Sequence, residues 1–174
     1  EGRFIEVLNA DLANDLGNLL NRTLTMLRKY QPDYRIPQVE IPADHPLKTL
    51  AETLTSLVAD AYECLDLSAA ARKALSLAQA SNKYLDEQAP WTLHKQGQSE
   101  QVAQILYAVL ESVRWVAVTL SPIIPALSLR ILQQMGFALE DVTQLRWDPD
   151  ASWGQLPAGQ EPQPPVPVFQ RILR

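Results

Sequence analysis

Amide and guanidinium side chains recur in the first apolar stretch of the chain, at Asn14, Asn18, Asn21 and Arg22. Asparagine is a poor residue for a helix interior, because its amide competes with the backbone for hydrogen bonds. Asn18 and Arg22 stand four residues apart, so on a helix they project from one face. An amide that both donates and accepts hydrogen bonds, next to a planar, positively charged guanidinium group, suits the edge of an exposed nucleic-acid base. Polar bonding between packed helices, or a solvated helix face, would explain the same residues.

A tryptophan follows a proline at a second polar segment, where Asn82-Lys83-Tyr84 precedes Pro90-Trp91. Proline ends the helix before it and so fixes the direction in which Trp91 points. A tryptophan on such a corner, next to polar residues, can serve as a platform on which a base stacks. The alternative is a hydrophobic lid folded back onto the helices. Trp115, by contrast, lies in a strongly apolar segment and is expected in the core.

Residues for catalysis or metal binding are missing from the sequence. There is no glycine-rich phosphate loop, and His45 and His94 lie far apart without spaced Cys, His or acidic companions. The net charge of −5 argues against a non-specific nucleic-acid binder but allows a protein that reads a few unpaired bases. Cys64 falls in an apolar helical pattern, so we expect it to be buried, and a single cysteine fits a reducing cytoplasm. We therefore expect no catalysis, cofactor or metal in this chain.

Apolar positions at steps of three and four residues predict an all-helical bundle. The pattern predicts about five helices, over residues 3–29, 47–65, 66–88, 100–120 and 122–136. Either Asp66 or Ser68 can cap the third helix, Ser99 and Ser121 are placed to cap the helices that follow them, and a polar loop covers 92–98. Prolines and glycines after residue 136 predict a mostly irregular tail over 137–174. No apolar run approaches the ~20 residues of a membrane span, so we expect no membrane partner.

Two segments together resemble the anticodon-binding domain of methionyl-tRNA synthetases, which are class I aminoacyl-tRNA synthetases. They are NADLANDLGNLLNR at residues 9–22 and NKYLDEQAPW at residues 82–91, and their order and spacing are those of the family. The stretch 121–125 (SPIIP) and a helix end at Gly136 also fit, so the resemblance covers residues 3–136. The family's catalytic signatures, His-Ile-Gly-His and Lys-Met-Ser-Lys-Ser, are absent, as expected of a chain that begins after the catalytic half.

The resemblance implies a site and its partners. The family's anticodon-contacting Asn and Arg fall on Asn18 and Arg22, its stacking Trp falls on Trp91 after Pro90, and Asn14 is a further candidate. Trp91 would stack on the first anticodon base, a cytosine, while Asn18 and Arg22 would contact base edges and nearby phosphate. The implied partners are the anticodon loop of tRNA(Met) and a Rossmann-type catalytic domain of the same polypeptide. That domain binds ATP and methionine and makes methionyl-tRNA, and the tail would pack towards it.

Two other interpretations stay open on the sequence alone. One is the anticodon domain of a related class I synthetase for Ile, Val, Leu or Cys, against which the 82–91 segment argues. The other is a helical protein-interaction module that uses Trp91 and the tail as docking elements and ignores RNA. The RNA and protein interpretations differ on whether Trp91 and Arg22 lie together on one exposed face.

Overall fold

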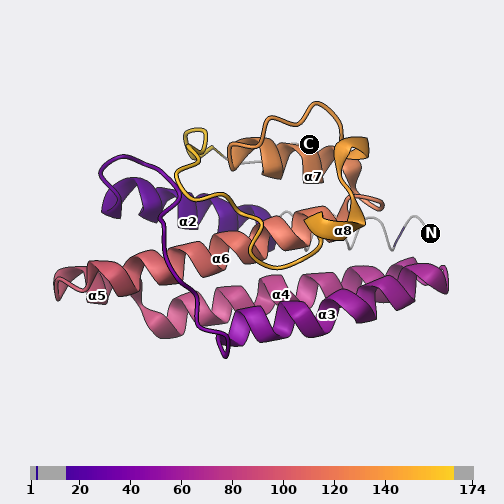
Figure 1. Ribbon diagram of the computed structural model, residues 1–174, viewed down its shortest axis with the longest axis horizontal. Helices are drawn as coiled ribbons and strands as arrows, with labels where there is room; N and C mark the ends of the chain where they lie inside the picture. The colour runs from indigo at the N-terminus through magenta and orange to yellow at the C-terminus, as the bar shows by residue number, and fades with distance from the viewer. Residues whose placement is uncertain (1–2, 4–14, 167–174) are drawn as a thin grey trace.

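The computed structural model describes residue 3 and residues 15–166, and these residues form helices, turns and irregular segments without a strand (Figure 1). The predicted all-α fold with an irregular tail is confirmed. Five helices of ten residues or more form the bundle, together with two shorter helices and one 3-10 turn in the described part. The elements are α2 (Gly17–Tyr30), α3 (Pro46–Glu63), α4 (Leu67–Gln88), α5 (Pro90–Lys95), α6 (Ser99–Leu120), α7 (Pro125–Gln134), η2 (Val142–Gln144) and α8 (Trp147–Asp150).

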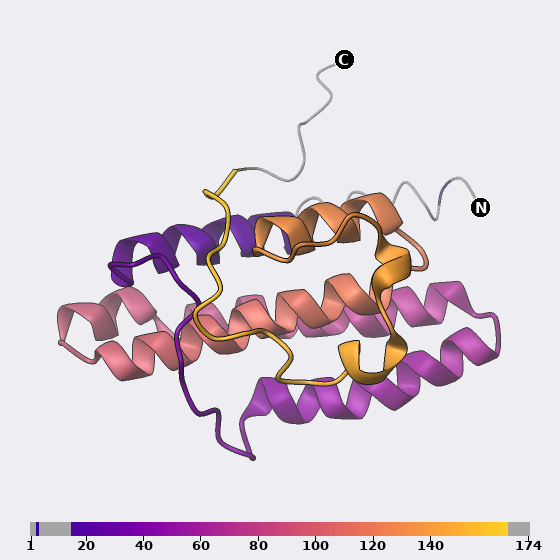
Figure 2. The same cartoon turned by 45° about the horizontal axis from the view of Figure 1, so that its top comes forward.

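Helix α6 is the centre of the bundle, with α2, α3, α4 and α7 packed around it (Figures 1 and 2). Its residues 105–120 are all buried, which fits a helix that is apolar over most of its circumference. Contrary to the expectation from the sequence, α6 has the length and apolar composition to cross a membrane. However, 94% of its most apolar window is buried inside the bundle, as in the core helix of a globular domain.

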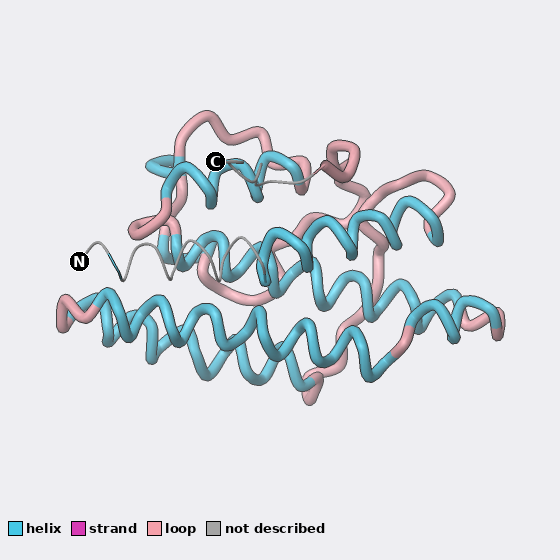
Figure 3. Tube along the Cα trace, turned by 180° about the vertical axis from the view of Figure 1, so that it is seen from behind, coloured by secondary structure: helices cyan, strands magenta, loops and turns pink. Residues whose placement is uncertain are grey.

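Helices α3 and α4 run side by side in opposite directions (Figure 3). Side chains cap the starts of both helices. The Nδ1 atom of His45 accepts a hydrogen bond from the Leu47 N–H at 3.2 Å, and Pro46 occupies the first position of α3. Asp66 caps α4, as its position in the sequence allowed, by accepting from the Ala69 N–H at 2.9 Å. These caps fix where each helix begins.

Three local predictions are wrong, each at the end of a helix. Cys64 is exposed, because α3 ends at Glu63 and leaves the thiol beyond the buried stripe of that helix. Ser99 is the first residue of α6 instead of its cap. Ser121 still closes the last turn of α6 with its N–H, so the next helix begins only at Pro125, where a proline again takes the first helical position.

A buried ion pair fastens the tail to α6. Arg114 Nη2 and Glu111 Oε1 lie 2.7 Å apart, and the two side chains are only 2% and 0% exposed. Arg114 also donates to the carbonyl oxygens of Asp150 and Ser152, at 2.6 and 2.7 Å. Glu111 accepts the backbone N–H groups of residues 154–156. Each buried charge thus has several partners, which offsets its removal from water.

Two further contacts hold the tail against the bundle. Trp115 lies in the core, as predicted, and its indole Nε1–H donates to the Ala151 carbonyl at 2.8 Å. Gly136 has a φ of 100°, and a Cβ at this position would lie 2.5 Å from the Glu161 carbonyl oxygen. Only glycine allows this close approach of the tail to the end of α7.

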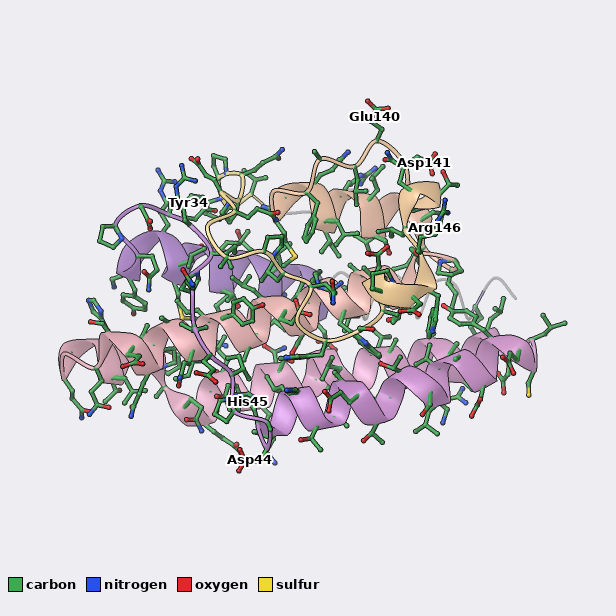
Figure 4. The ribbon with its side chains drawn as sticks, in the orientation of Figure 1. Tyr34, Asp44, His45, Glu140, Asp141 and Arg146 are labelled. Carbon is green, nitrogen blue, oxygen red and sulfur yellow. The ribbon has the colours of Figure 1, made fainter. Side chains whose placement is uncertain are left out.

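The tail also reaches the connection between α2 and α3. The Ile36 N–H donates to the Gln160 carbonyl at 2.9 Å, and the Gly159 N–H donates back to the Ile36 carbonyl at 2.8 Å. The Tyr34 hydroxyl donates to the Gln163 carbonyl at 2.5 Å, and Figure 4 shows Tyr34 beside this part of the tail. The described tail therefore packs on the bundle itself, while its expected contact with a catalytic half stays a prediction.

Candidate functional site

The junction between α4 and α5 sets the direction of Trp91. Helix α4 ends at Gln88, as predicted, and α5 begins at Pro90, so the loop predicted over 92–98 begins with a short helix. Proline disfavours the right-handed helical conformation in the residue before it, and Ala89 between the two helices is left-handed, with φ 45° and ψ 64°. A non-glycine residue there costs roughly 1–2 kcal/mol. Pro90, the next residue, is buried.

Arg22 and Trp91 meet where α2 passes the corner. The Arg22 Cζ atom lies 5.5 Å from the centroid of the Trp91 ring, within the range of a cation–π contact. The Arg22 Nη2 donates to Asp86 Oδ1 at 2.6 Å. The Arg22 side chain is 39% exposed and the Asp86 side chain 62% exposed. The guanidinium is therefore held between an indole and a carboxylate, in a position that a ligand in solution can reach.

The predicted site residues occupy different surroundings. Trp91 is half-buried and packs partly against the core, so it is neither a free platform nor an enclosed lid. Asn18 is exposed on the turn before Arg22, on the same face of α2. Pro90 is buried, so it positions Trp91 without offering a surface of its own. Asn14 lies outside the described residues. The fold thus unites Arg22 and Trp91, with Asn18 on the adjoining turn.

Three residues of this region were not singled out as a site from the sequence: Asp86, Tyr30 and His94. The rings of Tyr30 and His94 stack, with centroids 4.3 Å apart and planes tilted by 30°. The Lys29 ammonium lies 5.6 Å from the centroid of the Tyr30 ring. Arg22 and Asp86 are 64 positions apart in the chain, so no local pattern could have paired them.

The surface formed by α2 and α5 is cationic, although the chain as a whole carries a net charge of −5. Neither helix contains an acidic residue. Their cations are Arg22, Arg28, Lys29 and Lys95, and the last three lie in the final turns of the helices, where the helix dipole favours positive charge. Asp86 of α4 is bonded to Arg22. This part of the surface is therefore suited to a negatively charged partner.

The Tyr84 side chain of the second predicted segment has a structural role. Its hydroxyl lies 2.9 Å from the His45 Nε2 atom. Figure 4 shows His45 next to Asp44, at the start of α3. Because His45 Nδ1 accepts from the backbone, Nε2 carries the proton and donates to Tyr84. Burial lowers the pKa of His45, against the opposing charge of Asp44, and burial raises the pKa of Tyr84. This contact ties α4 to the connection between α2 and α3.

The chemistry available on the α2–α5 surface is recognition. An indole and an imidazole offer faces for bases, a guanidinium and an amide offer hydrogen bonds, and the lysines can contact phosphate. Among residues 15–166, no three His, Cys, Asp or Glu side chains gather in a way that could hold a metal ion. A planar, phosphate-bearing ligand with unpaired edges fits these groups best.

Comparison with known proteins identifies the family. The family model described as the anticodon binding domain of methionyl tRNA ligase matches residues 40–174. A methionine–tRNA ligase of Thermosynechococcus vestitus is 49% identical over 180 residues, covering 99% of this chain and 34% of that relative. A relative from Arabidopsis thaliana, named as the chloroplastic/mitochondrial methionine–tRNA ligase, is 42% identical and covers 99% of this chain and 28% of its own length.

Solved structures agree with these relatives. The methionyl-tRNA synthetase of Mycobacterium tuberculosis, in complex with methionyl-adenylate, superposes with a TM-score of 0.83 at 30% identity. The match covers 96% of this chain and 33% of that chain, so the chain spans about a third of the length of the proteins it matches. These matches favour the methionine family over the related synthetases for Ile, Val, Leu and Cys. The chain therefore belongs to the family of anticodon-binding domains of methionyl-tRNA ligases.

Proposed function

We propose that the surface formed by α2 and α5 binds the anticodon loop of tRNA(Met). The observation that carries this proposal is the Arg22 guanidinium seated over the half-buried Trp91 ring, on a surface whose two helices carry cations and no acids. An unpaired base can stack on an aromatic ring, and a neighbouring guanidinium group can bond to the base or to its phosphate. The exposed amide of Asn18 adds a group that can both donate and accept.

Each residue has a distinct task in this proposal. Trp91 stacks on the first anticodon base, a cytosine, and the corner at Pro90 holds the indole in place. Arg22 contacts the base edge or the adjoining phosphate, and it either keeps its bond to Asp86 or exchanges it for the RNA. Asn18 bonds to a second edge, and a base with the wrong edge leaves these polar groups unpaired. Asn14, one turn earlier in the chain, stays a candidate.

In the whole protein this domain would serve methionine–tRNA ligase. The relatives named so are about three times as long as this chain. The remainder would contain the catalytic domain that uses ATP to attach methionine, and binding at the anticodon would help to position the distant acceptor end. We place this enzyme in the cytoplasm, although the Arabidopsis relative is named as chloroplastic/mitochondrial.

A titration of the 174-residue chain with two anticodon stem-loops tests the proposal. One stem-loop carries the methionine anticodon, and the other differs only in the first anticodon base. The titration is run at low salt, because a chain with a net charge of −5 is expected to bind RNA weakly. We expect tighter binding of the first stem-loop, and we expect Trp91→Ala to lose about 1–3 kcal/mol of that binding energy.

The matched control is Thr92→Ala, an exposed neighbour on α5, which should bind like the unaltered chain. Thermal melting of Trp91→Ala shows whether the bundle survives the substitution. Equal affinity for the two stem-loops, or binding unchanged in Trp91→Ala, would refute anticodon reading through this indole. Binding to neither stem-loop would favour the protein-interaction module instead.

A further inference from the structure

We infer that Tyr30 and His94 form a second stacking position, which receives a nucleotide adjacent to the base on Trp91. The inference deepens the proposed function and rests on it, because it assigns a second contact to the same RNA loop. It concerns two rings that the anticodon proposal leaves without a task. Neither ring has a catalytic or metal-binding neighbour in the described part of the chain.

The two rings of α5 lie in series along that helix. Trp91 and His94 are three residues apart on α5, so they lie on one face of that helix, about 4.5 Å apart along its axis. Arg22 and Tyr30, which contact these two rings, lie along the facing helix α2. The Arg22–Trp91 and Tyr30–His94 contacts therefore follow one another along the line where α2 and α5 face each other. Proteins that hold single-stranded nucleic acid place aromatic rings in such a series, one for each of several successive bases.

The His94 ring is supported by Tyr30. His94 is exposed, and one face of its ring rests on Tyr30 at a centroid distance of 4.3 Å. Tyr30 is itself half-buried and packs against the core. A supported ring loses less rotational freedom when a ligand stacks on it, so binding costs less than at a free side chain. A base added to the exposed side would extend the stack to base, imidazole and phenol.

The stacked pair also has positive charge around it. Lys29 lies beside Tyr30, and Lys95 follows His94, so cations flank the stacked pair. The phosphate that joins two neighbouring nucleotides would lie between the two stacking positions and within reach of a lysine. Helix-dipole stabilisation explains cations at these helix ends, but it does not explain why two aromatic rings stack between them.

Fluorescence quenching of 2-aminopurine tests the inference with the full 174-residue chain. Two stem-loops with the methionine anticodon each carry 2-aminopurine at one neighbour of the first anticodon base, before it or after it. We expect one of the two probes to be quenched on binding, since stacking on a ring quenches this base. His94→Ala should abolish that quenching and weaken binding about fivefold, the lower end of the effect of losing one stacked base.

Two variants separate stacking from other effects. His94→Phe keeps an aromatic ring without its nitrogen atoms, and it should restore both quenching and affinity. Gln96→Ala, exposed at the end of α5, should behave like the unaltered chain. His94 is exposed, so its replacement should leave the melting temperature unchanged.

The outcomes distinguish this inference from the proposed function. If the unaltered chain binds and Trp91→Ala weakens binding, but neither probe depends on His94, the second stacking position is wrong and the anticodon proposal stands. If His94→Ala weakens binding and His94→Phe does not restore it, the imidazole acts by hydrogen bonding or charge, and stacking is overturned. Absence of binding by the unaltered chain overturns both.

Discussion

Two arginine–carboxylate pairs in this domain have nearly equal shortest N···O distances and opposite surroundings. Arg22 and Asp86 join at 2.6 Å, and Arg114 and Glu111 join at 2.7 Å. The first pair lies at the surface, with side chains 39% and 62% exposed, whereas the second is 2% and 0% exposed. Water competes for the first pair and screens its charges, so its net contribution to stability is small. The second pair has no such competitor, and its charges depend on each other and on the tail.

The difference shows that burial, more than distance, decides what an ion pair can do. The surface pair can exchange a partner for a ligand at little cost, which suits a recognition site. The buried pair cannot, because any missing partner leaves a charge without solvent. An arginine and a carboxylate therefore provide an adaptable contact at one position and a fixed anchor at the other.

The largest expected effect comes from breaking the buried pair. Glu111→Leu leaves the Arg114 guanidinium without its carboxylate and also removes the acceptor of the N–H groups of residues 154–156. We expect the free energy of unfolding in urea to fall by about 3–5 kcal/mol. A loss below about 1 kcal/mol would show that water reaches this pair and would remove the contrast with the surface pair.

The surface pair should matter more for binding than for stability. Arg22→Lys keeps the positive charge but loses the planar fork that lies over Trp91 and bonds to Asp86. We expect the affinity for the methionine anticodon stem-loop to fall by about 1–2 kcal/mol. The melting temperature should hardly change. A large drop in melting temperature with unchanged affinity would assign Arg22 a structural role.

High pH should weaken the contact between the tail and α6 by titrating Tyr107. Burial, followed by the Glu111 charge, raises the pKa of Tyr107 to about 12, against the opposing charge of Arg114. Its hydroxyl donates to the Leu156 carbonyl at 2.9 Å, in a buried position. The folded state therefore holds this proton more tightly than the unfolded chain, so the contribution is complete below about pH 10 and is lost between about pH 10 and 12.

Tyr107→Phe provides the measurement. At neutral pH, the free energy of unfolding of this variant should be about 1 kcal/mol lower than that of the unaltered chain, because one hydrogen bond is lost. The difference in unfolding free energy between the variant and the unaltered chain should decrease as the pH rises above about 10. A difference that stays constant up to about pH 12 would mean that this hydroxyl has the same pKa in the folded and unfolded states, and would contradict the raised pKa of Tyr107.

The smallest effect should come from neutralising the surface carboxylate. Asp86→Asn removes a charge that is 62% exposed, so we expect a change in unfolding free energy of less than about 1 kcal/mol. RNA affinity should rise about two- to fivefold at low salt, because the guanidinium is released and a negative charge is removed from the site. Weaker binding would mean that Asp86 must hold Arg22 in place while the RNA is bound.

The helices and the corner that holds Trp91 could be predicted from the sequence because they depend on residues that are close together in the chain. The apolar periodicity located α3, α4 and α6 to within a few residues, and Pro90 marked the corner that holds Trp91. Exposure of Cys64 was missed because an apolar pattern does not show that a helix ends at Glu63. The start of α7 was misplaced because the Ser121-Pro122 cap pattern also fits a turn at the end of α6.

The remaining features depend on partners that are distant in the chain. Glu111 and Arg114 lie in the most apolar helix, where their charges look out of place until residues 150–156 surround them. Asp86 meets Arg22 only after α2 and α4 have packed around α6. Periodicity locates elements, but it does not specify which faces of those elements will meet.

The tail contacts restrict the order in which parts of the protein can fold while the chain is being synthesised. Tyr34 bonds to Gln163, and the two residues are 129 positions apart. A ribosome adds roughly 5–20 residues each second, so the connection after α2 waits about 6–26 s for its partner. Helices α2 to α6 can pack during that time, but Tyr34 and Ile36 in the connection between α2 and α3 still lack their hydrogen-bond partners in the tail. The last stage of folding therefore begins only when residues 150–163 have left the ribosome.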